Sequence, residues 1–227
     1  MNGPVNFFIL SKRSAFRELV RFVLEWQFVC NVITSDSESG ALEYLRDTEI
    51  FPNMIIYEYE SDAYLVEDFM VYIKESAKPV HFMVLAEKIN GAAAEFFDHH
   101  KSFHLVKTAN LFKEVFDLSR ISFMGIAVDN TAPWCRVHLD GLAALNGVAR
   151  DLFIKLPSGR IVRLFESGQA TETDLEKYRA RGLQFLWLER PTSDWIIAQI
   201  QTQFHIFTKN KSFNFVLRGP EGSREEL

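Results

Sequence analysis

The chain has 227 residues, of which 48% are hydrophobic and 24% are charged, and its formal net charge is −5. These values are typical of a soluble globular protein with one large or two small domains, and they exclude a disordered polyelectrolyte. No apolar run approaches the ~20 residues that a bilayer span requires. No basic segment precedes the first apolar run, as a signal peptide would need. We therefore expect a cytoplasmic protein without membrane insertion.

Charge is distributed unevenly along the chain. Residues 1–120 carry 12 Lys and Arg against 18 Asp and Glu, a net −6, whereas residues 121–227 carry 13 against 12, a net +1. An acidic half joined to a nearly neutral half predicts two domains. The overall acidity argues against a general nucleic-acid binder, which usually has a basic face, so no nucleic-acid partner is expected.

The first 120 residues alternate short apolar runs with amphipathic segments. The expected strands are 7–10, 28–34, 52–58, 79–86 and 103–106, and the expected helices begin near Ser14 and Ser35 and cover 66–73, 92–98 and 111–118. Strands that alternate with helices imply right-handed βαβ crossovers and a parallel sheet covered on both faces. We predict an α/β fold for residues 1–120.

Glu58 is the main candidate site residue of this half. The apolar run 54–56 opens onto Tyr57, Glu58, Tyr59 and Glu60. In open α/β sheets, binding sites lie just beyond the carboxyl ends of the strands. The third strand should therefore deliver the Glu58 carboxylate to a site. The alternative is a solvated residue at a strand end.

The spacing of strands and helices in segment 5–120 resembles the receiver domain of two-component response regulators. The resemblance implies a flavodoxin-like (βα)5 parallel sheet. It also implies an aspartate at the end of the third strand that accepts a phosphoryl group, where this chain has Glu58. An acidic pair that helps to hold Mg²⁺ would follow the first strand, where this chain has Ser11 and Lys12.

Two further positions of the receiver pattern lie after the fourth and fifth strands. The hydroxyl expected at the end of the fourth strand is missing, since Leu85 or Ala86 stands there. The lysine after the fifth strand is kept as Lys107, followed by Thr108 in place of the usual proline. His104 replaces the usual aromatic residue.

These departures weaken the chemistry of phosphoryl transfer. Mg²⁺ needs carboxylate and phosphate oxygens, and Lys12 adds a positive charge in place of a ligand. Glu58 is one methylene longer than Asp, which displaces its oxygens by about an ångström, enough to cost ~10²-fold in a reaction. We expect an internal ion pair of Glu58 with Lys107 or Lys12, and a phosphorylation-independent pseudo-receiver. Retained phosphorylation is the alternative.

The resemblance also implies a docking face, because receivers dimerise or bind partners through their fourth and fifth helices and fifth strand. On this chain the candidate interface residues are Phe96, Phe97, Phe103, His104 and Phe112. An exposed aromatic cluster there would mark an interface. We expect protein partners and a homodimer.

The second half is expected to be a smaller mixed α/β domain. Residues 121–134 are interpreted as a linker, with a sixth strand of the first domain as the alternative, and 201–227 as a C-terminal extension and flexible tail. Within 135–200, strands are expected at 136–139 and 183–188, a hairpin at 152–165, and helices at 171–181 and from 195 through 200 or beyond. The turn 157–160 (PSGR) is the strongest hairpin signal of the chain.

The stretches DLFIKLPSGRIVRLFESGQ and LEKYRARGLQFLWLER resemble a small α/β module found beside receiver, HD-GYP and diguanylate-cyclase-type domains in bacterial signalling proteins. Arg160 and Arg163 are candidate nucleotide-binding residues, because the forked donors of Arg suit phosphate. A cyclic-dinucleotide sensor is therefore one alternative function. The regulatory half of a larger signalling enzyme is another.

Catalytic and cofactor motifs are missing from the sequence. His99 and His100 are adjacent and would point apart on a helix, so they make a poor metal site even beside His104. No paired acid and base, activated nucleophile or phosphate loop is found. We expect no cofactor, no metal and no enzymatic activity, and therefore a non-catalytic signalling adaptor that acts through protein–protein interaction.

Overall fold

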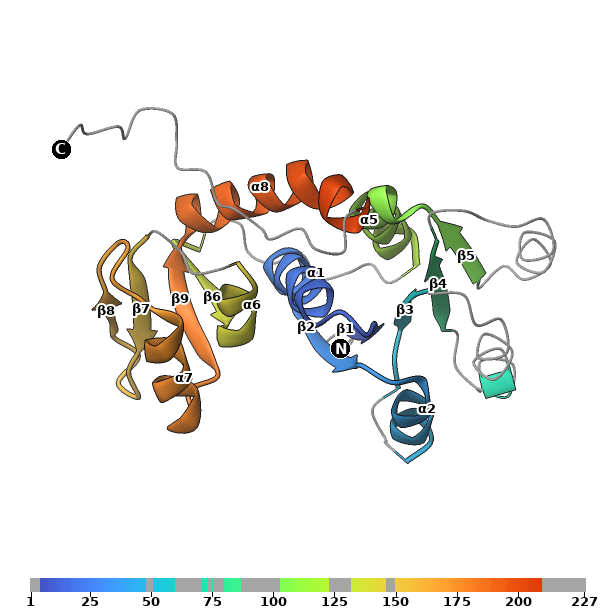
Figure 1. Cartoon of the computed structure of the whole chain (residues 1–227), viewed down its shortest axis with the longest axis horizontal. Coiled ribbons are helices and arrows are strands. Elements are labelled where there is room, and N and C mark those ends of the chain that lie inside the picture. The colour runs from blue at the N-terminus through green and yellow to red at the C-terminus, as the bar shows by residue number, and fades with distance from the viewer. Residues whose placement is uncertain are drawn as a thin grey trace. The chain divides into compact units, whose positions relative to one another are not determined.

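The computed structural model describes residues 5–47, 51–59, 71–72, 75, 80–86, 103–122, 132–145 and 150–209. The chain divides into two compact units, Met1–Val128 and Asp129–Leu227 (Figure 1). Among the described residues, no helix combines the length and apolarity that crossing a membrane requires.

Unit 1 contains a five-stranded parallel sheet. Its strands are β1 (Val5–Leu10), β2 (Cys30–Ser35), β3 (Met54–Glu58), β4 (His81–Leu85) and β5 (Phe103–Val106). They lie in the order β2-β1-β3-β4-β5, and every neighbouring pair is parallel. The five strands expected from the sequence are confirmed. Strand β1 lies at the point where the order reverses, with β2 on one side and β3 on the other.

The described helices of unit 1 are α1 (Ser14–Gln27), α2 (Glu38–Asp47), the short 3-10 helix η1 (Thr108–Asn110) and α5 (Leu111–Ser122). Helix α1 buries Phe16, Leu19 and Val23, which recur at helical spacing. Ser14 was expected to cap this helix, but it is the first helical residue, and the capping position belongs to Arg13, whose side chain makes no capping hydrogen bond. The helices expected at 66–73 and 92–98 lie outside the described residues, apart from positions 71 and 72, which are helical.

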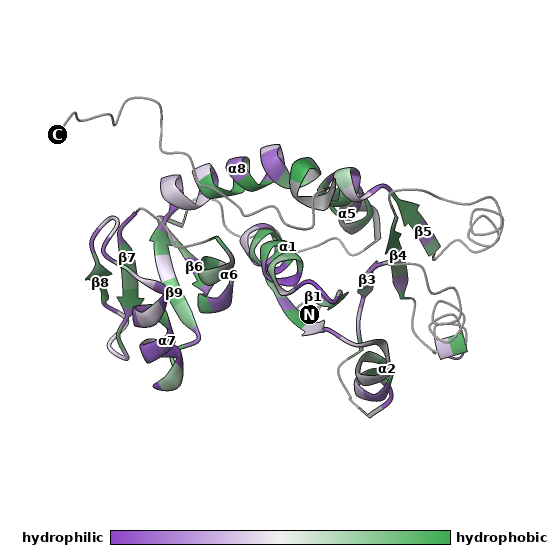
Figure 2. Ribbon diagram, in the orientation of Figure 1, coloured by the Kyte–Doolittle hydropathy of each residue, from purple (hydrophilic) through white to green (hydrophobic). Residues whose placement is uncertain are grey.

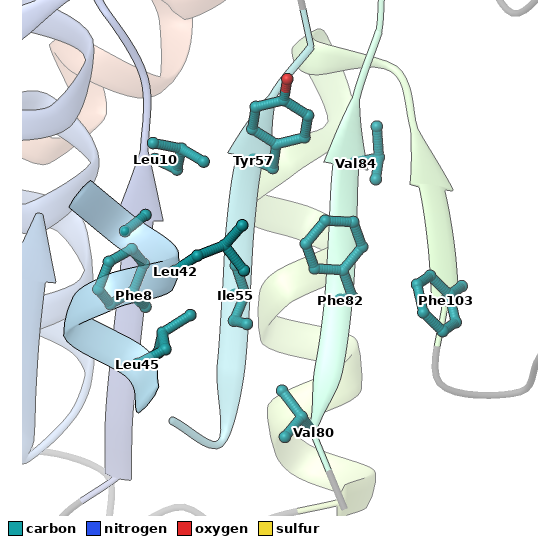
Figure 3. Packing of buried hydrophobic residues seen from close by; sticks show 11 residues of the cluster. Phe8, Leu10, Leu42, Leu45, Ile55, Tyr57, Val80, Phe82, Val84 and Phe103 are labelled. Carbon is teal, nitrogen blue, oxygen red and sulfur yellow. The ribbon is translucent and has the colours of Figure 1, made fainter. Parts of the chain in front are cut away.

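One face of this sheet forms a continuous apolar core with α2. Side chains from β1, β3, β4 and β5 alternate onto this face because successive strand residues point to opposite sides. Figure 3 shows these side chains along the sheet, with Leu42 and Leu45 of α2 beside Phe8 and Ile55. Phe7 lies on the opposite face and contacts Phe28, which in turn contacts Phe116 of α5. Both faces of the sheet are therefore covered, as a parallel sheet requires.

Unit 2 contains a four-stranded antiparallel sheet. Its strands are β6 (Trp134–His138), β7 (Leu152–Lys155), β8 (Ile161–Phe165) and β9 (Phe185–Glu189), in the order β6-β9-β7-β8. Its helices are α6 (Leu139–Ala144), α7 (Glu172–Ala180) and α8 (Arg190–Lys209). Unlike the sheet of unit 1, this sheet is built by hairpins and long antiparallel returns.

Local turn and cap chemistry explains two elements of unit 2. Gly159, with φ of +85°, takes a left-handed turn conformation between β7 and β8, so the expected hairpin is confirmed. Thr171 caps α7 through a reciprocal capping box with Asp174. Helix α7 is largely purple in Figure 2 and Leu175 is its buried residue, so it is a mostly solvated helix that depends on this cap.

Helix α8 stands where a helix was expected from residue 195 through 200 or beyond. It begins at Arg190 rather than Trp195 and continues through Lys209, so residues 201–209 are helical. Ile196, Ile200 and Phe204 are all buried, and their spacing of four residues marks one continuous helical stripe. The expected linker is also shorter, because residues 121 and 122 belong to α5 and Trp134 belongs to β6.

Candidate functional site

The candidate site of unit 1 lies where the carboxyl ends of β1 and β3 meet. The two strands are in register, with Leu10 opposite Tyr57, so the residues that follow, Ser11 and Glu58, emerge side by side. The backbone N–H of Ser11 also donates to the carbonyl of Ser35 at the end of β2, at 3.1 Å. Topology thus brings three strand ends to one point, the place where open α/β sheets bind ligands.

The carboxylate of Glu58 is held by an arginine that follows β1. Arg13 Nε donates to Glu58 Oε2 at 3.1 Å, and Arg13 Nη2 donates to Glu58 Oε1. Ser11 Oγ donates to the same Oε2. The two side chains of the ion pair are mostly buried, with 15% of Arg13 and 11% of Glu58 exposed. This two-pronged pairing of guanidinium and carboxylate is the strongest kind of ion pair in proteins.

The short segment between β1 and α1 positions the arginine. The backbone N–H of Arg13 donates to Ser11 Oγ at 3.0 Å, so Ser11 both orders this turn and binds Glu58. Arg17 Nη1 donates to the Ser11 carbonyl. The Arg13 guanidinium also lies over the ring of Phe16, at 5.3 Å from its centre. We call Ser11, Arg13 and Glu58 the closed cluster.

The closed cluster corrects the expected ion pair of Glu58. Among the described residues, its hydrogen bonds come from Ser11 and Arg13, and the expected cations Lys12 and Lys107 are exposed. Lys107 follows β5, which is separated from β3 by β4 in the sheet. The sequence reasoning missed Arg13 because the receiver pattern draws attention to the two positions before it. The sequence did place an arginine close to the end of the first strand. A guanidinium can donate two parallel hydrogen bonds to a carboxylate, which the ammonium group of Lys cannot do.

The neighbouring strand end is apolar. Leu85 lies opposite Glu58 in register, and its carbonyl accepts a hydrogen bond from the Tyr59 N–H at 3.0 Å. Ala86 is buried, and its N–H donates to the Val106 carbonyl. The backbone of Ala86 therefore links β4 to β5. Its methyl side chain has no hydroxyl that could donate a hydrogen bond to a phosphoryl group.

The geometry of the closed cluster opposes metal binding. Both oxygens of Glu58 already accept hydrogen bonds, and a guanidinium stands next to them. Mg²⁺ requires several oxygen ligands and is repelled by an adjacent cation. Within the described part of the chain, no group of three His, Cys, Asp or Glu side chains around Glu58 converges to metal-binding distance.

Two of the five residues expected to form a docking face are part of the core. Phe103 is buried against Phe82, with ring centres 5.4 Å apart, and Phe112 is buried and stacks on Phe116. The expected exposed aromatic cluster is therefore wrong for these two positions, because their strand and helix faces point inward. Phe96 and Phe97 lie outside the described residues.

His104 pairs with a second histidine. Its Nε2 atom lies 3.0 Å from Nδ1 of His81, and the two rings stack with their centres 5.2 Å apart. One imidazole must donate and the other accept. Burial lowers the pKa of both rings, and for His104 the charge of His81 lowers the pKa further. The pair bridges β4 and β5 within unit 1.

The candidate nucleotide-binding arginines of unit 2 do not form a joint site. Arg163 is paired with Asp151 at 3.1 Å and with Glu166 at 2.9 Å. The hydrogen bond that Arg163 donates to Asp151 and the nearby Glu166 charge raise the pKa of Arg163. Arg160 is exposed at the hairpin turn, three residues away. Arg160 precedes β8, whereas Arg163 lies within it opposite Phe153 and already has two carboxylate partners.

No family model, curated protein or solved structure matches this chain. Functional inference therefore depends on the geometry of the two units.

Proposed function

We propose that unit 1 is a receiver-like signalling domain that is held permanently in one state by the closed cluster. The strand order β2-β1-β3-β4-β5 is that of flavodoxin-like doubly wound sheets, and Glu58 stands at their switch point. The protein is then a non-catalytic, phosphorylation-independent adaptor in the bacterial cytoplasm, which acts through protein–protein interaction and as a homodimer.

The bidentate pair of Arg13 and Glu58 carries this proposal. In a responsive receiver, a phosphoryl group changes the charge at the end of the third strand, and the sheet edge rearranges around it. Here the Arg13 guanidinium supplies a fixed internal partner to the carboxylate at the same place. A covalent switch is replaced by a buried ion pair, whose disruption leaves an uncompensated charge. The surface of unit 1 would therefore keep one conformation for its partner.

The test is thermal unfolding of the full chain with Mg²⁺ and beryllofluoride, which mimics a phosphoryl group on a carboxylate. We expect no stabilisation of the wild type. A variant with Ser11→Asp, Lys12→Asp and Glu58→Asp, which reinstates the acidic positions, gives the positive comparison for Mg²⁺ binding. Stabilisation of the wild type, or its labelling by acetyl phosphate, would overturn the proposal.

The dimer is tested separately by light scattering of the purified chain at micromolar concentration. A monomeric mass would remove the homodimer from the proposal and leave the closed cluster unaffected.

A further inference from the structure

One face of the sheet in unit 2 gathers aromatic rings and cations. Registers between β6, β9 and β7 place Arg136 opposite Trp187 and Trp187 opposite Phe153, so these residues share one side of the sheet. We define the aromatic face by the six residues Trp134, Arg136, Phe153, Lys155, Phe185 and Trp187. The four rings are half-buried and the two cations are exposed.

The opposite side of the same sheet is the core of unit 2. Cys135 and Val137 of β6, and Leu186 and Leu188 of β9, are buried there. Helix α8 contacts both β6 and β9, and α6 contacts β6. The helices thus cover the side that alternates with the aromatic face, and four large rings on the other side stay partly accessible. Aromatic side chains rarely stay accessible in such numbers without a binding role.

The rings and cations are already arranged in contact with one another. The Arg136 guanidinium lies 4.3 Å from the centre of the Phe185 ring, and Lys155 Nζ lies 5.1 Å from that of Trp187. Trp134 meets Phe153 edge to face, with ring centres 4.7 Å apart. A guanidinium plane held on a ring presents its outer side for stacking, and fixed cations lose less freedom when an anion binds.

The cations of this face differ in their partners. Arg163, opposite Phe153 on the β8 side of the face, is paired with Asp151 and Glu166. Within the described part of unit 2, Arg136 and Lys155 make cation–π contacts and no ion pair. Glu189 lies opposite Trp134, at one end of this side. The centre of the face therefore carries uncompensated positive charge beside rings.

We propose that the aromatic face binds single-stranded nucleic acid. Bases stack on the accessible parts of the half-buried rings and on the guanidinium plane of Arg136, and phosphates lie between Arg136 and Lys155. Such platforms tolerate any sequence because every base has a π-face. Strands β6, β9 and β7 span about 10 Å, which suits about two bases. The net charge of −5 conceals this local face. The proposal is independent of the state of Glu58.

The first experiment is fluorescence anisotropy of labelled (dT)12 and (rU)12 with the full chain at several salt concentrations. Two phosphate contacts predict that the logarithm of the affinity falls with that of salt with a slope of about −1.4. Arg136→Ala or Lys155→Ala should each lower that slope by about 0.7. Lys177→Ala, an ion-paired cation on α7, is the matched control and should change nothing.

The second experiment separates stacking from charge. Trp187→Ala should weaken binding about tenfold without changing the salt slope, whereas Trp187→Phe, which keeps a ring, should bind nearly as the wild type does. Circular dichroism checks the fold of each variant. Glu189→Gln should tighten binding about twofold by removing the local negative charge.

The proposal is overturned if neither oligonucleotide binds at low salt, or if Arg136→Ala and Lys155→Ala bind as the wild type does. Tighter binding of a 12-bp duplex would also overturn it. A 12-residue polyglutamate peptide has charge but no bases, so equal affinity for it would overturn the stacking and point to an acidic protein segment. Unchanged affinity of Trp187→Ala for the oligonucleotides would likewise show that the bases do not stack on this face.

Discussion

The closed cluster of unit 1 and the aromatic face of unit 2 each contain an arginine, but the two guanidinium groups have different partners. Arg13 forms two hydrogen bonds to the buried Glu58 carboxylate, whereas Arg136 lies on the Phe185 ring with no carboxylate partner. A buried, fully paired charge fixes one structure and has little left to offer a ligand. An exposed cation on a ring keeps its hydrogen-bond donors available. Pairing therefore separates the structural arginine from the binding arginine.

Among the tests of this comparison, the variant Arg13→Ala should have the largest effect on stability. Removing the guanidinium leaves Glu58 buried and unpaired, which should lower the free energy of unfolding by about 3 kcal/mol. Urea denaturation measures the loss. The double variant Arg13→Met with Glu58→Met should be more stable than Arg13→Met alone, because no charge is then left behind. A loss below about 1 kcal/mol for Arg13→Ala would show that the cluster does not hold unit 1 together.

The histidine pair tests whether unit 1 contains a second closed polar contact. Burial lowers the pKa of His81 and His104 in the folded protein, so the unfolded chain binds more protons below pH 6.5. Their contribution to stability is present above pH 6.5 and is lost as the pH falls through the lowered folded values. The loss is at most about 1.4 kcal/mol per pH unit for each proton.

The measurement for this prediction is the pH dependence of urea unfolding between pH 7 and 5. The variant His81→Gln with His104→Gln should have a flatter dependence than the wild type. Equal slopes would mean that the pair does not titrate on unfolding.

Helix α7 provides a smaller test in unit 2. Thr171→Ala removes the cap hydrogen bond to the Asp174 N–H and should cost about 1 kcal/mol. Thr173 is exposed within the same helix, so Thr173→Ala serves as the control and should not destabilise the protein. Thermal unfolding of the two variants gives the comparison. Equal melting temperatures would show that the cap does not support this solvated helix.

The smallest expected effect on stability is that of Arg136→Ala, which can be compared directly with Arg13→Ala. Arg136→Ala should change stability by no more than about 0.5 kcal/mol, because exposed cation–π contacts are weak. The same guanidinium-to-alanine change at Arg13 should cost several times more. Urea unfolding of both variants under one condition makes the comparison, and similar losses would contradict the division between a closed cluster and an open face.

Local sequence patterns accounted for most elements and for little of the site. Alternating apolar runs located β1 to β5, and the turn chemistry around Gly159 located the hairpin of β7 and β8. The end of α8 was left open at residue 200 or beyond, although Phe204 continues the spacing of Ile196 and Ile200. The helical spacing of apolar residues continues beyond residue 200, so the helix could have been extended in the sequence as far as Phe204.

The partners of individual side chains were harder to anticipate. Phe103 and Phe112 were expected on an interface and lie in the core, since strand phase and helix rotation decide which way a ring points. The alternation of rings with cations at 134–138 and 153–155 is visible in the sequence. Its meaning depends on strand pairing, which sets distant segments side by side.

The sequence by itself determined the α/β class of unit 1, the division of charge between two halves and the placement of Glu58 at a strand end, because these follow from short-range periodicity. Only the tertiary structure decided that Arg13 pairs with Glu58, that Lys107 does not, and that Arg136 shares a face with Trp187 and Phe153. The residues of each pair, Arg13 and Glu58, Arg136 and Trp187, and Phe153 and Trp187, are more than 30 positions apart in the sequence. The first pair also depends on how the turn after β1 orients the Arg13 side chain. Strand order and register fix such contacts, and no local pattern encodes them.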